Sequence, residues 1–273
     1  TSTFEREIIN MQLNSRVAME RLSFIFSHAG FGCSDSFQDG KTMDGDDPDN
    51  GSMTIGTFIW DVQDQSPPDG LSPDSVVAVY GFKEVAEVDG DYTNSTDSNI
   101  DFKNIVTPTI SDDTANDFKN FIHFFPNFAG NRFYQVTENS DPFDIDTSVE
   151  LLLDGGSVYM VTPTRVKVAN GTLQFQNFCY DPGKWTIADN IQDLQLKYTT
   201  DGTTWVGNPG DPNAVIGIAI NLLARSENED PNYTDVKQYI YQWPDNSTDT
   251  VGPFNDGFHR KHARAQVWLR NTE

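Results

Sequence analysis

The densest group of possible metal ligands lies early in the chain, in the run MDGDDPDNGS at residues 43–52. Four carboxylates fall close together there: Asp44, Asp46, Asp47 and Asp49. Closely spaced carboxylate oxygens on a tight loop are ligands that Ca²⁺ prefers. Pro48 stands where an EF-hand would place its third ligand, and no Glu follows at the required distance. We interpret the run as a solvated acidic loop and keep calcium as the alternative; no other cofactor is indicated.

The residues give no pattern that is typical of catalysis. The four histidines form no His-Glu-x-x-His pair, and Cys-x-x-Cys, Gly-x-Ser-x-Gly and a Gly-rich phosphate loop are all absent from the sequence. With 41 acidic residues, the choice of any carboxylate pair as an acid and a base would be arbitrary. We therefore assign no catalytic residue and predict that the chain is not an enzyme.

One basic run stands out near the end of the sequence, where Arg260, Lys261 and Arg264 surround the pair His259 and His262. Its simplest interpretation is a solvated segment that leads into the last strand. The alternative is a contact with an acidic face of a neighbouring subunit.

Composition narrows the class of protein. The chain has 273 residues and a formal charge of −23, from 41 acidic against 18 basic residues. Such a chain repels phosphate backbones, which argues against a nucleic-acid partner. A hydrophobic content of 37% indicates a globular fold, and the longest apolar run, at 214–224, is too short to span a bilayer.

A single amphipathic helix is predicted over residues 3–29. Apolar side chains recur there at steps of three and four, with Ser15 in the place of one of them. The members of this stripe are Phe4, Ile8, Met11, Ala18, Leu22 and Ile25. Gly30 and Gly32 provide a helix stop. An apolar stripe that protrudes beyond its own sheet marks a surface for a partner.

Short strand-like runs follow the helix, after a turn-rich loop expected at 34–56. Strands are predicted at 57–62, 75–85, 121–125 and 131–137, within 148–180, around 185–199, at 213–226 and at 262–271. A polar stretch at about 87–117 is expected to be an insertion of loops at the edge of the sheet, and another polar loop precedes the last strand. A long helix that leads into a large antiparallel sheet gives an α+β fold.

Four segments in this order resemble the PilW-like minor pilins of type IV pili and, more distantly, pseudopilin J of type II secretion. The helix tail matches the pattern of the family through Arg16, Ala18, Leu22, Gly30, Phe31, Gly32 and Cys33. The segment IADNIQDLQLKYTTDG matches through Ile187, Ile191, Asp193, Leu194, Gln195, Tyr198, Asp201 and Gly202. The next strand matches through Ile218, Ile220, Leu222, Leu223, Arg225 and Ser226, and the close through Leu269, Arg270 and Asn271. Residues 34–184 carry no such motif.

The resemblance implies a type IV pilin-like fold, with residues 1–33 as the second half of a long pilin helix and 34–273 as one β-rich body. It implies a missing apolar segment before Thr1 that anchors in the inner membrane. The chain would then be a structural subunit at the periplasmic face of that membrane. Later it would lie at the pilus tip, where it primes filament assembly with other minor pilins and the major pilin. The residues expected to contact these partners are Phe4, Ile8, Met11 and Ser15.

The two cysteines, Cys33 and Cys179, fit this setting. On the sequence alone they are either one disulfide or two buried thiols. A periplasmic pilin would favour the disulfide, which closes a loop of about 145 residues and stabilises the fold by about 4–5 kcal/mol in the chain-entropy model.

The alternative function is a secreted calcium- or carbohydrate-binding β-rich module that resembles an adhesin. It would use the acidic run at 43–52 for calcium. Trp205 and Trp243, which lie beside Gly, Pro and Asn residues, would form an exposed platform for a sugar.

Overall fold

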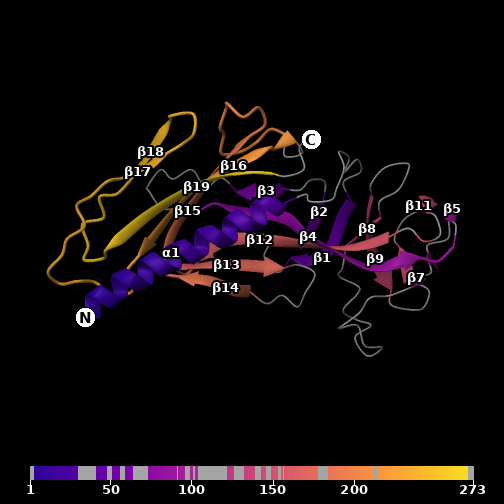
Figure 1. Cartoon of the computed structure of the whole chain (residues 1–273), viewed down its shortest axis with the longest axis horizontal. Coiled ribbons are helices and arrows are strands. Elements are labelled where there is room, and N and C mark those ends of the chain that lie inside the picture. Colours follow the sequence, from indigo (N-terminus) through magenta and orange to yellow (C-terminus); the bar gives the residue numbers. More distant parts are fainter. Residues whose placement is uncertain are drawn as a thin grey trace.

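A computed structural model describes residues 3–29, 41–47, 51–55, 59–63, 73–90, 92–95, 99–100, 102–103, 122–125, 132–138, 143–145, 149–152, 155, 157–177, 184–211 and 214–269. Figure 1 shows one helix laid along a body of β-strands. The predicted α+β class is confirmed.

The helix, α1 (Thr3–His28), has nearly the bounds that its apolar stripe predicts. It ends in a turn at Ala29, whose backbone N–H donates to the Phe26 carbonyl at 3.2 Å. Met11, Ser15, Ala18, Leu22 and Ile25 are all buried. The recurrence at three and four residues therefore identifies the face that α1 turns toward its own body.

The strands follow in chain order, and every pairing between them is antiparallel. They are β1 (Lys41–Asp47), β2 (Gly51–Ile55), β3 (Ile59–Gln63), β4 (Ser75–Val88), β5 (Tyr92–Ser95), β6 (Asn99–Ile100), β7 (Phe102–Lys103), β8 (Ile122–Phe125), β9 (Arg132–Glu138), β10 (Phe143–Ile145), β11 (Val149–Leu152), β12 (Ser157–Ala169), β13 (Thr172–Asn177), β14 (Lys184–Asp189), β15 (Ile191–Thr199), β16 (Gly217–Arg225), β17 (Tyr239–Gln242), β18 (Thr248–Val251) and β19 (Arg260–Trp268).

Two sheets support the helix. A ten-stranded sheet runs β14-β13-β12-β8-β9-β10-β6, with β4 also paired to β12, and a three-stranded sheet runs β15-β16-β19. Helix α1 packs on β19 and β16 of the smaller sheet and on β14 and β4 of the larger one. Asp74 joins the two sheets, because its N–H donates to the Leu194 carbonyl at 2.8 Å and its carboxylate accepts from the Leu196 N–H at 2.7 Å. The helix is therefore held by two sheets and not by one.

The main core fills the space between α1 and these sheets. Leu22 and Phe26 of the helix belong to it, together with Val166 of β12 and with Ile220 and Leu222 of β16. The nine residues of β16 are buried except for Arg225, which is half-buried. This confirms that both faces of the strand are covered, as the apolar residues on its two faces predict.

A second, smaller core covers the face of the three-stranded sheet that is turned away from α1. Ala219 and Leu223 of β16 meet Tyr241, Trp243 and Val251 of the β17–β18 hairpin there. The Tyr241 hydroxyl donates to the Asp193 carboxylate at 2.8 Å, and its ring stacks on His262 at 5.0 Å between centroids. The sequence predicts only a polar loop in this region, and the β17–β18 hairpin shows that this prediction was wrong.

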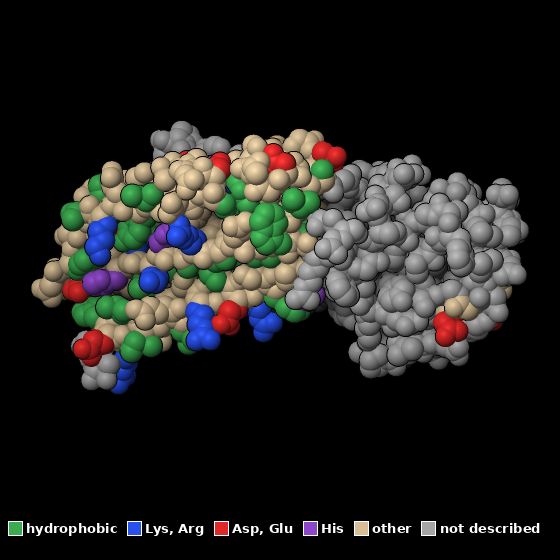
Figure 2. Space-filling model, turned by 45° about the horizontal axis from the view of Figure 1, so that its top comes forward, with side chains coloured by type: hydrophobic (Ala, Val, Ile, Leu, Met, Phe, Trp, Pro, Cys, Tyr) green, Lys and Arg blue, Asp and Glu red, His purple; other side chains and the backbone are tan. Residues whose placement is uncertain are grey.

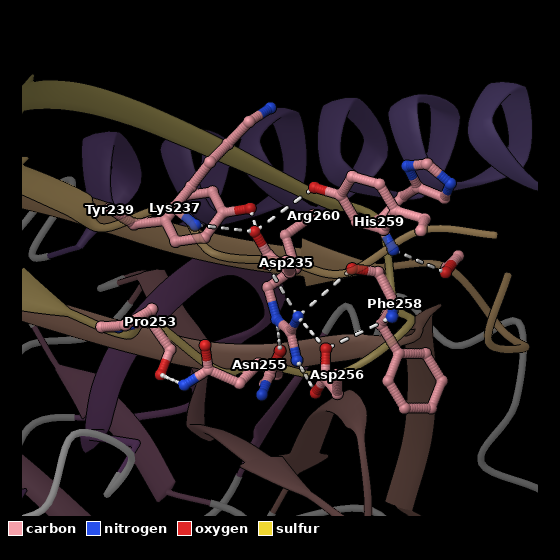
Figure 3. A network of polar contacts seen from close by, with 12 residues as sticks. Asp235, Lys237, Tyr239, Pro253, Asn255, Asp256, Phe258, His259 and Arg260 are labelled. Carbon is pink, nitrogen blue, oxygen red and sulfur yellow. Dashed lines mark hydrogen bonds and ion pairs between the residues drawn. The ribbon is translucent and has the colours of Figure 1, made fainter. Parts of the chain in front are cut away.

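A buried polar network fixes the segment that carries this hairpin, as Figure 3 shows. The Arg260 side chain is fully buried and donates to Asp235 at 2.8 Å and to Asp256 at 2.6 Å. Its Nε–H donates to the Gln192 side chain at 2.7 Å, and its guanidinium lies 3.8 Å from the centroid of the Phe254 ring. The carboxylate of Asp235 also accepts from the Tyr239 hydroxyl at 2.9 Å. Six residues from three stretches of chain are thereby in contact with one another.

Most predicted strands are present with shifted ends, including the last one, whose Val267 and Leu269 are buried as expected. The loop expected at 34–56 is wrong in part, because β1 and β2 form an antiparallel hairpin there. Within the expected insertion at 87–117, β5, β6 and β7 are short strands. The Asn170-Gly171 turn between β12 and β13 is confirmed, and both residues have positive φ, at 53° and 74°.

Candidate functional site

Helix α1 has two apolar faces, and the one singled out by the sequence is turned inward. Met11 is 5% exposed and Ser15 3% exposed, while Phe4 and Ile8 are half-buried, with Ile8 packed on the main core. For Met11 and Ser15 the expected role as partner contacts is therefore wrong. The periodic stripe that predicts the helix is the stripe that the chain's own sheets cover, because burial against the core is what makes the pattern periodic.

A second set of apolar side chains lies on the outward face of α1. Ile9 is 57% exposed, Leu13 55% and Phe24 51%. Ile9 and Leu13 are one turn apart, and Phe24 follows Leu13 after eleven residues, or about three turns of α-helix. Val17, half-buried, continues the spacing of four from Leu13. We call Ile9, Leu13, Val17 and Phe24 the outer stripe.

Polar contacts fix the helix surface around the outer stripe. Arg16 and Glu20, which are both exposed, form an ion pair at 2.8 Å one turn apart. The Phe24 ring lies against the His28 ring with centroids 4.3 Å apart. The Phe24 carbonyl accepts a hydrogen bond from the Ser27 hydroxyl at 3.0 Å, and the His28 Nδ1 lies 2.7 Å from it. The stripe is thus presented on an ordered helix end.

The amino-terminal half of α1 is held to the body by a buried carboxylate. Glu7 is 8% exposed, and its carboxylate accepts hydrogen bonds from the backbone N–H of Asn228 at 3.2 Å and from its side-chain amide at 2.9 Å. The Asn14 amide donates to the Asp189 carbonyl at 3.0 Å. These bonds set the rotation of the helix, and with it the direction in which the outer stripe points.

The surface of the described part is mixed in character. Figure 2 shows hydrophobic side chains at several places on one face, with Lys, Arg, His and acidic side chains between them. A surface of this kind suits contact with another protein better than isolated apolar residues do.

The basic run near the last strand is mostly engaged inside the chain. Arg260 is neutralised by Asp235 and Asp256, and His259 lies 3.3 Å from the Asp230 carboxylate. His262 lies 2.8 Å from the Asn221 side-chain oxygen, and burial lowers its pKa below the ordinary value for histidine. Of the five residues only Lys261 and Arg264 are exposed, so the run is not a cationic patch of five groups.

The prediction that Trp205 and Trp243 form an exposed platform for a sugar is wrong. Trp205 and Trp243 are 5% and 3% exposed, because both fill the second core. The tryptophans exposed in the described part are Trp185 and Trp268, at 48% and 49%. The turn residues beside Trp205 and Trp243 in the sequence misled the prediction, since a turn can hold an aromatic ring against a sheet as well as away from it.

Two sets of candidate residues remain predictions. The structure places Asp44, Asp46 and Asp47 in β1 but does not describe their side chains. Asp49 lies outside the described residues. Cys33 and Cys179 are also outside the described residues. Among the described residues, no three His, Cys, Asp or Glu side chains are grouped to hold a metal ion. In the described part, α1 lacks the length of apolar sequence needed to cross a membrane.

Comparison with known proteins gives a likeness to a solved structure. No protein-family model matches the chain, and no curated protein does. Among solved structures, a type IV-like pilin from Thermus thermophilus is similar over 59% of this chain and 93% of its own, with 18% identity and a TM-score of 0.28.

Proposed function

We propose that this chain is a structural pilin-type subunit, which assembles with other pilin helices through the outer stripe of α1. The observation that carries the proposal is the exposure of Ile9, Leu13 and Phe24 along a helix whose opposite face is buried. A helix that is apolar on two opposite sides has one side for its own core and one for a partner.

The finer role is a minor pilin at the tip of a type IV pilus, where it helps to prime filament assembly with other minor pilins. This role rests on the resemblance of its four segments to PilW-like minor pilins, and a type II secretion pseudopilin is the related possibility. The location that goes with it is the periplasmic face of the inner membrane and then the pilus tip. A structural role needs no catalytic group, in keeping with the absence of catalytic motifs from the sequence.

The experiment is co-purification with minor pilins from the same cells. Leu13→Ser removes an exposed apolar side chain from the outer stripe, and we expect it to reduce the retained partner by about tenfold or more, as loss of a central apolar anchor does. Gln12→Ser is the matched control, because Gln12 is exposed on the same helix but off the stripe, and it should retain the partner. Equal retention by both variants would count against the proposal.

Met11 is unsuitable for this test. Its side chain is buried in the main core, so a charged residue there would unfold the helix from its sheets and abolish any partner binding indirectly. Substitutions in the exposed outer stripe change contact with a partner without disturbing the core, so their effect on binding is distinct from an effect on folding.

A further inference from the structure

A polar cleft lies beside the first half of α1, away from the outer stripe. Its volume is about 440 Å³. Asn10 of the helix forms one side, Asn170 at the β12–β13 turn another, and Asp189 and Asn190 between β14 and β15 a third. Arg225 and Glu227, at the end of β16 and just after it, complete the lining. Four segments of the chain therefore meet there.

The walls of this cleft are held in place by contacts behind them. Glu7, which also lines it, is bonded to Asn228, and Asn14 is bonded to the Asp189 carbonyl. The Arg225 guanidinium lies 4.3 Å from the centroid of the Phe258 ring. Because its walls are already fixed, little free energy is lost in ordering their side chains when a ligand binds.

Six polar side chains of the lining have no hydrogen-bond or ion-pair partner among the described residues. The amides of Asn10, Asn170 and Asn190, the carboxylates of Asp189 and Glu227, and the guanidinium of Arg225 make no hydrogen bond or ion pair to another described side chain or backbone group. Hydrogen-bond donors and acceptors therefore both line one cleft. A ligand that satisfies them must donate and accept at several points at once.

Charge narrows the ligand further. The lining carries the carboxylates of Glu7, Asp189 and Glu227 against the single guanidinium of Arg225, which disfavours an anion. Its carboxylates do not form a metal-binding group in the described structure, which disfavours a bound cation. What remains is a neutral molecule rich in hydroxyl groups, since each hydroxyl is both a donor and an acceptor.

The geometry points to this cleft as a binding site for a neutral saccharide. Its volume lies within the range of about 300–1,000 Å³ that small-molecule sites occupy. Met11, which also lines the cleft, offers an apolar surface for the C–H face of a sugar ring. The site is separate from Trp205 and Trp243, and it goes beyond the role in assembly because it uses none of the outer stripe.

The test is a titration of the chain with neutral mono- and disaccharides, followed by saturation-transfer NMR. We expect a dissociation constant on the order of 1 mM for the best of them. Asn10→Ala and Asn170→Gly should each weaken binding about three- to tenfold through the loss of hydrogen bonds. Both variants keep the fold, because Asn10 is exposed in a helix that favours Ala, and Asn170 has a φ of 53° that Gly adopts freely.

Matched controls separate this site from general surface effects. Gln12→Ala changes the same helix outside the cleft, and Asn246→Gly changes an exposed turn residue with a φ of 65° outside it. Both should bind the saccharide as the wild type does. Leu13→Ser should also bind normally, so that loss of assembly and loss of sugar binding are distinct results. No binding of any neutral saccharide, equal binding by the cleft variants, or tighter binding of an anionic sugar would overturn the inference.

Discussion

At the scale of single residues, the fold buries charges only where it supplies partners for them. Asp235 and Arg260 have fully buried side chains, and the pair is completed by Asp256, Gln192 and Tyr239. Hydrogen bonds to Asp256 and Asp235 raise the pKa of Arg260 despite its burial, which by itself lowers that pKa. If one charged residue of this network is removed, the charge of its former partner stays buried without an opposite charge beside it.

Arg260→Ala should therefore destabilise the chain by about 3–5 kcal/mol, the usual result when one partner of a buried ion pair is deleted. Denaturant unfolding measures this free energy directly. Arg264→Ala is the control, because Arg264 is an exposed residue of the same strand with one hydrogen bond to Gln242, and it should change stability by less than about 1 kcal/mol. A small effect at position 260 would show that the network contributes little to the fold.

Asp193 gives a prediction about pH. Burial raises the pKa of this carboxyl, and the hydrogen bonds from Gln195 and Tyr241 only partly oppose the shift. The folded chain therefore binds this proton more tightly than the unfolded chain does. The resulting stabilisation is complete below the unfolded pKa of about 3.9 and is lost as the pH rises through the higher folded value.

Asp193→Asn removes this titration. We expect the stability of the wild type relative to Asp193→Asn to increase as the pH is lowered from about 7 to about 4, measured by urea unfolding at each pH. Asp201→Asn should show the opposite trend when the series is extended below pH 4. Hydrogen bonds from the backbone N–H groups of Thr204 and Thr203 lower the pKa of Asp201, so its stabilisation is present above the unfolded pKa of about 3.9 and is lost as the pH falls toward the lower folded value. The same trend for both variants would refute the assignment of the raised pKa to Asp193.

At the scale of elements, the two faces of α1 make different demands on their residues. Leu22 is fully buried in the main core, whereas Leu13, on the same helix, is 55% exposed. The same substitution at the two positions thus separates the face that holds the fold from the face that is free for a partner.

Leu22→Ala should destabilise the chain by about 2–5 kcal/mol, from lost burial and the cavity left behind. Leu13→Ala should be nearly neutral, within about 0.5 kcal/mol, because an exposed helix position accepts Ala readily. Thermal and urea unfolding of the two variants give the comparison. Comparable losses at both positions would mean that the outer stripe is part of the core.

The elements also show how much of the structure is predictable from sequence. Helix α1 and strands such as β15, β16 and β19 are long and periodic, so their positions follow from pattern alone. The β17–β18 hairpin was missed because each strand has four residues and only Tyr241 and Val251 in the strands are buried. The docking surface is harder to predict from the sequence than the helix itself. An apolar stripe identifies an amphipathic helix, but it does not tell whether the chain's own sheets or a partner cover that stripe. The Arg260 network and the cleft join residues far apart in the sequence, and no local pattern encodes them.

At the scale of the whole molecule, α1 lies across two sheets, as Figure 1 shows. Its outer stripe is exposed, with Ile9, Leu13 and Phe24 more than half exposed. The β17–β18 hairpin covers the face of the smaller sheet that is turned away from α1. Val236, just before β17, and Ile240, within it, are 67% and 58% exposed. The helix thus packs on one face of the smaller sheet, and the β17–β18 hairpin packs on the opposite face. This division suits a subunit that is built into an assembly along one side.

The most direct measurement of the central claim is site-specific photo-crosslinking in cells that assemble the filament. A photoreactive residue at position 13, on the outer stripe, should form an adduct with a second pilin-type subunit. The same residue at position 236, which is outside α1 and even more exposed, at 67% against 55%, should form far less of that adduct. An adduct at position 236 alone, or equal yields at both positions, would contradict the assignment of the outer stripe as the docking surface.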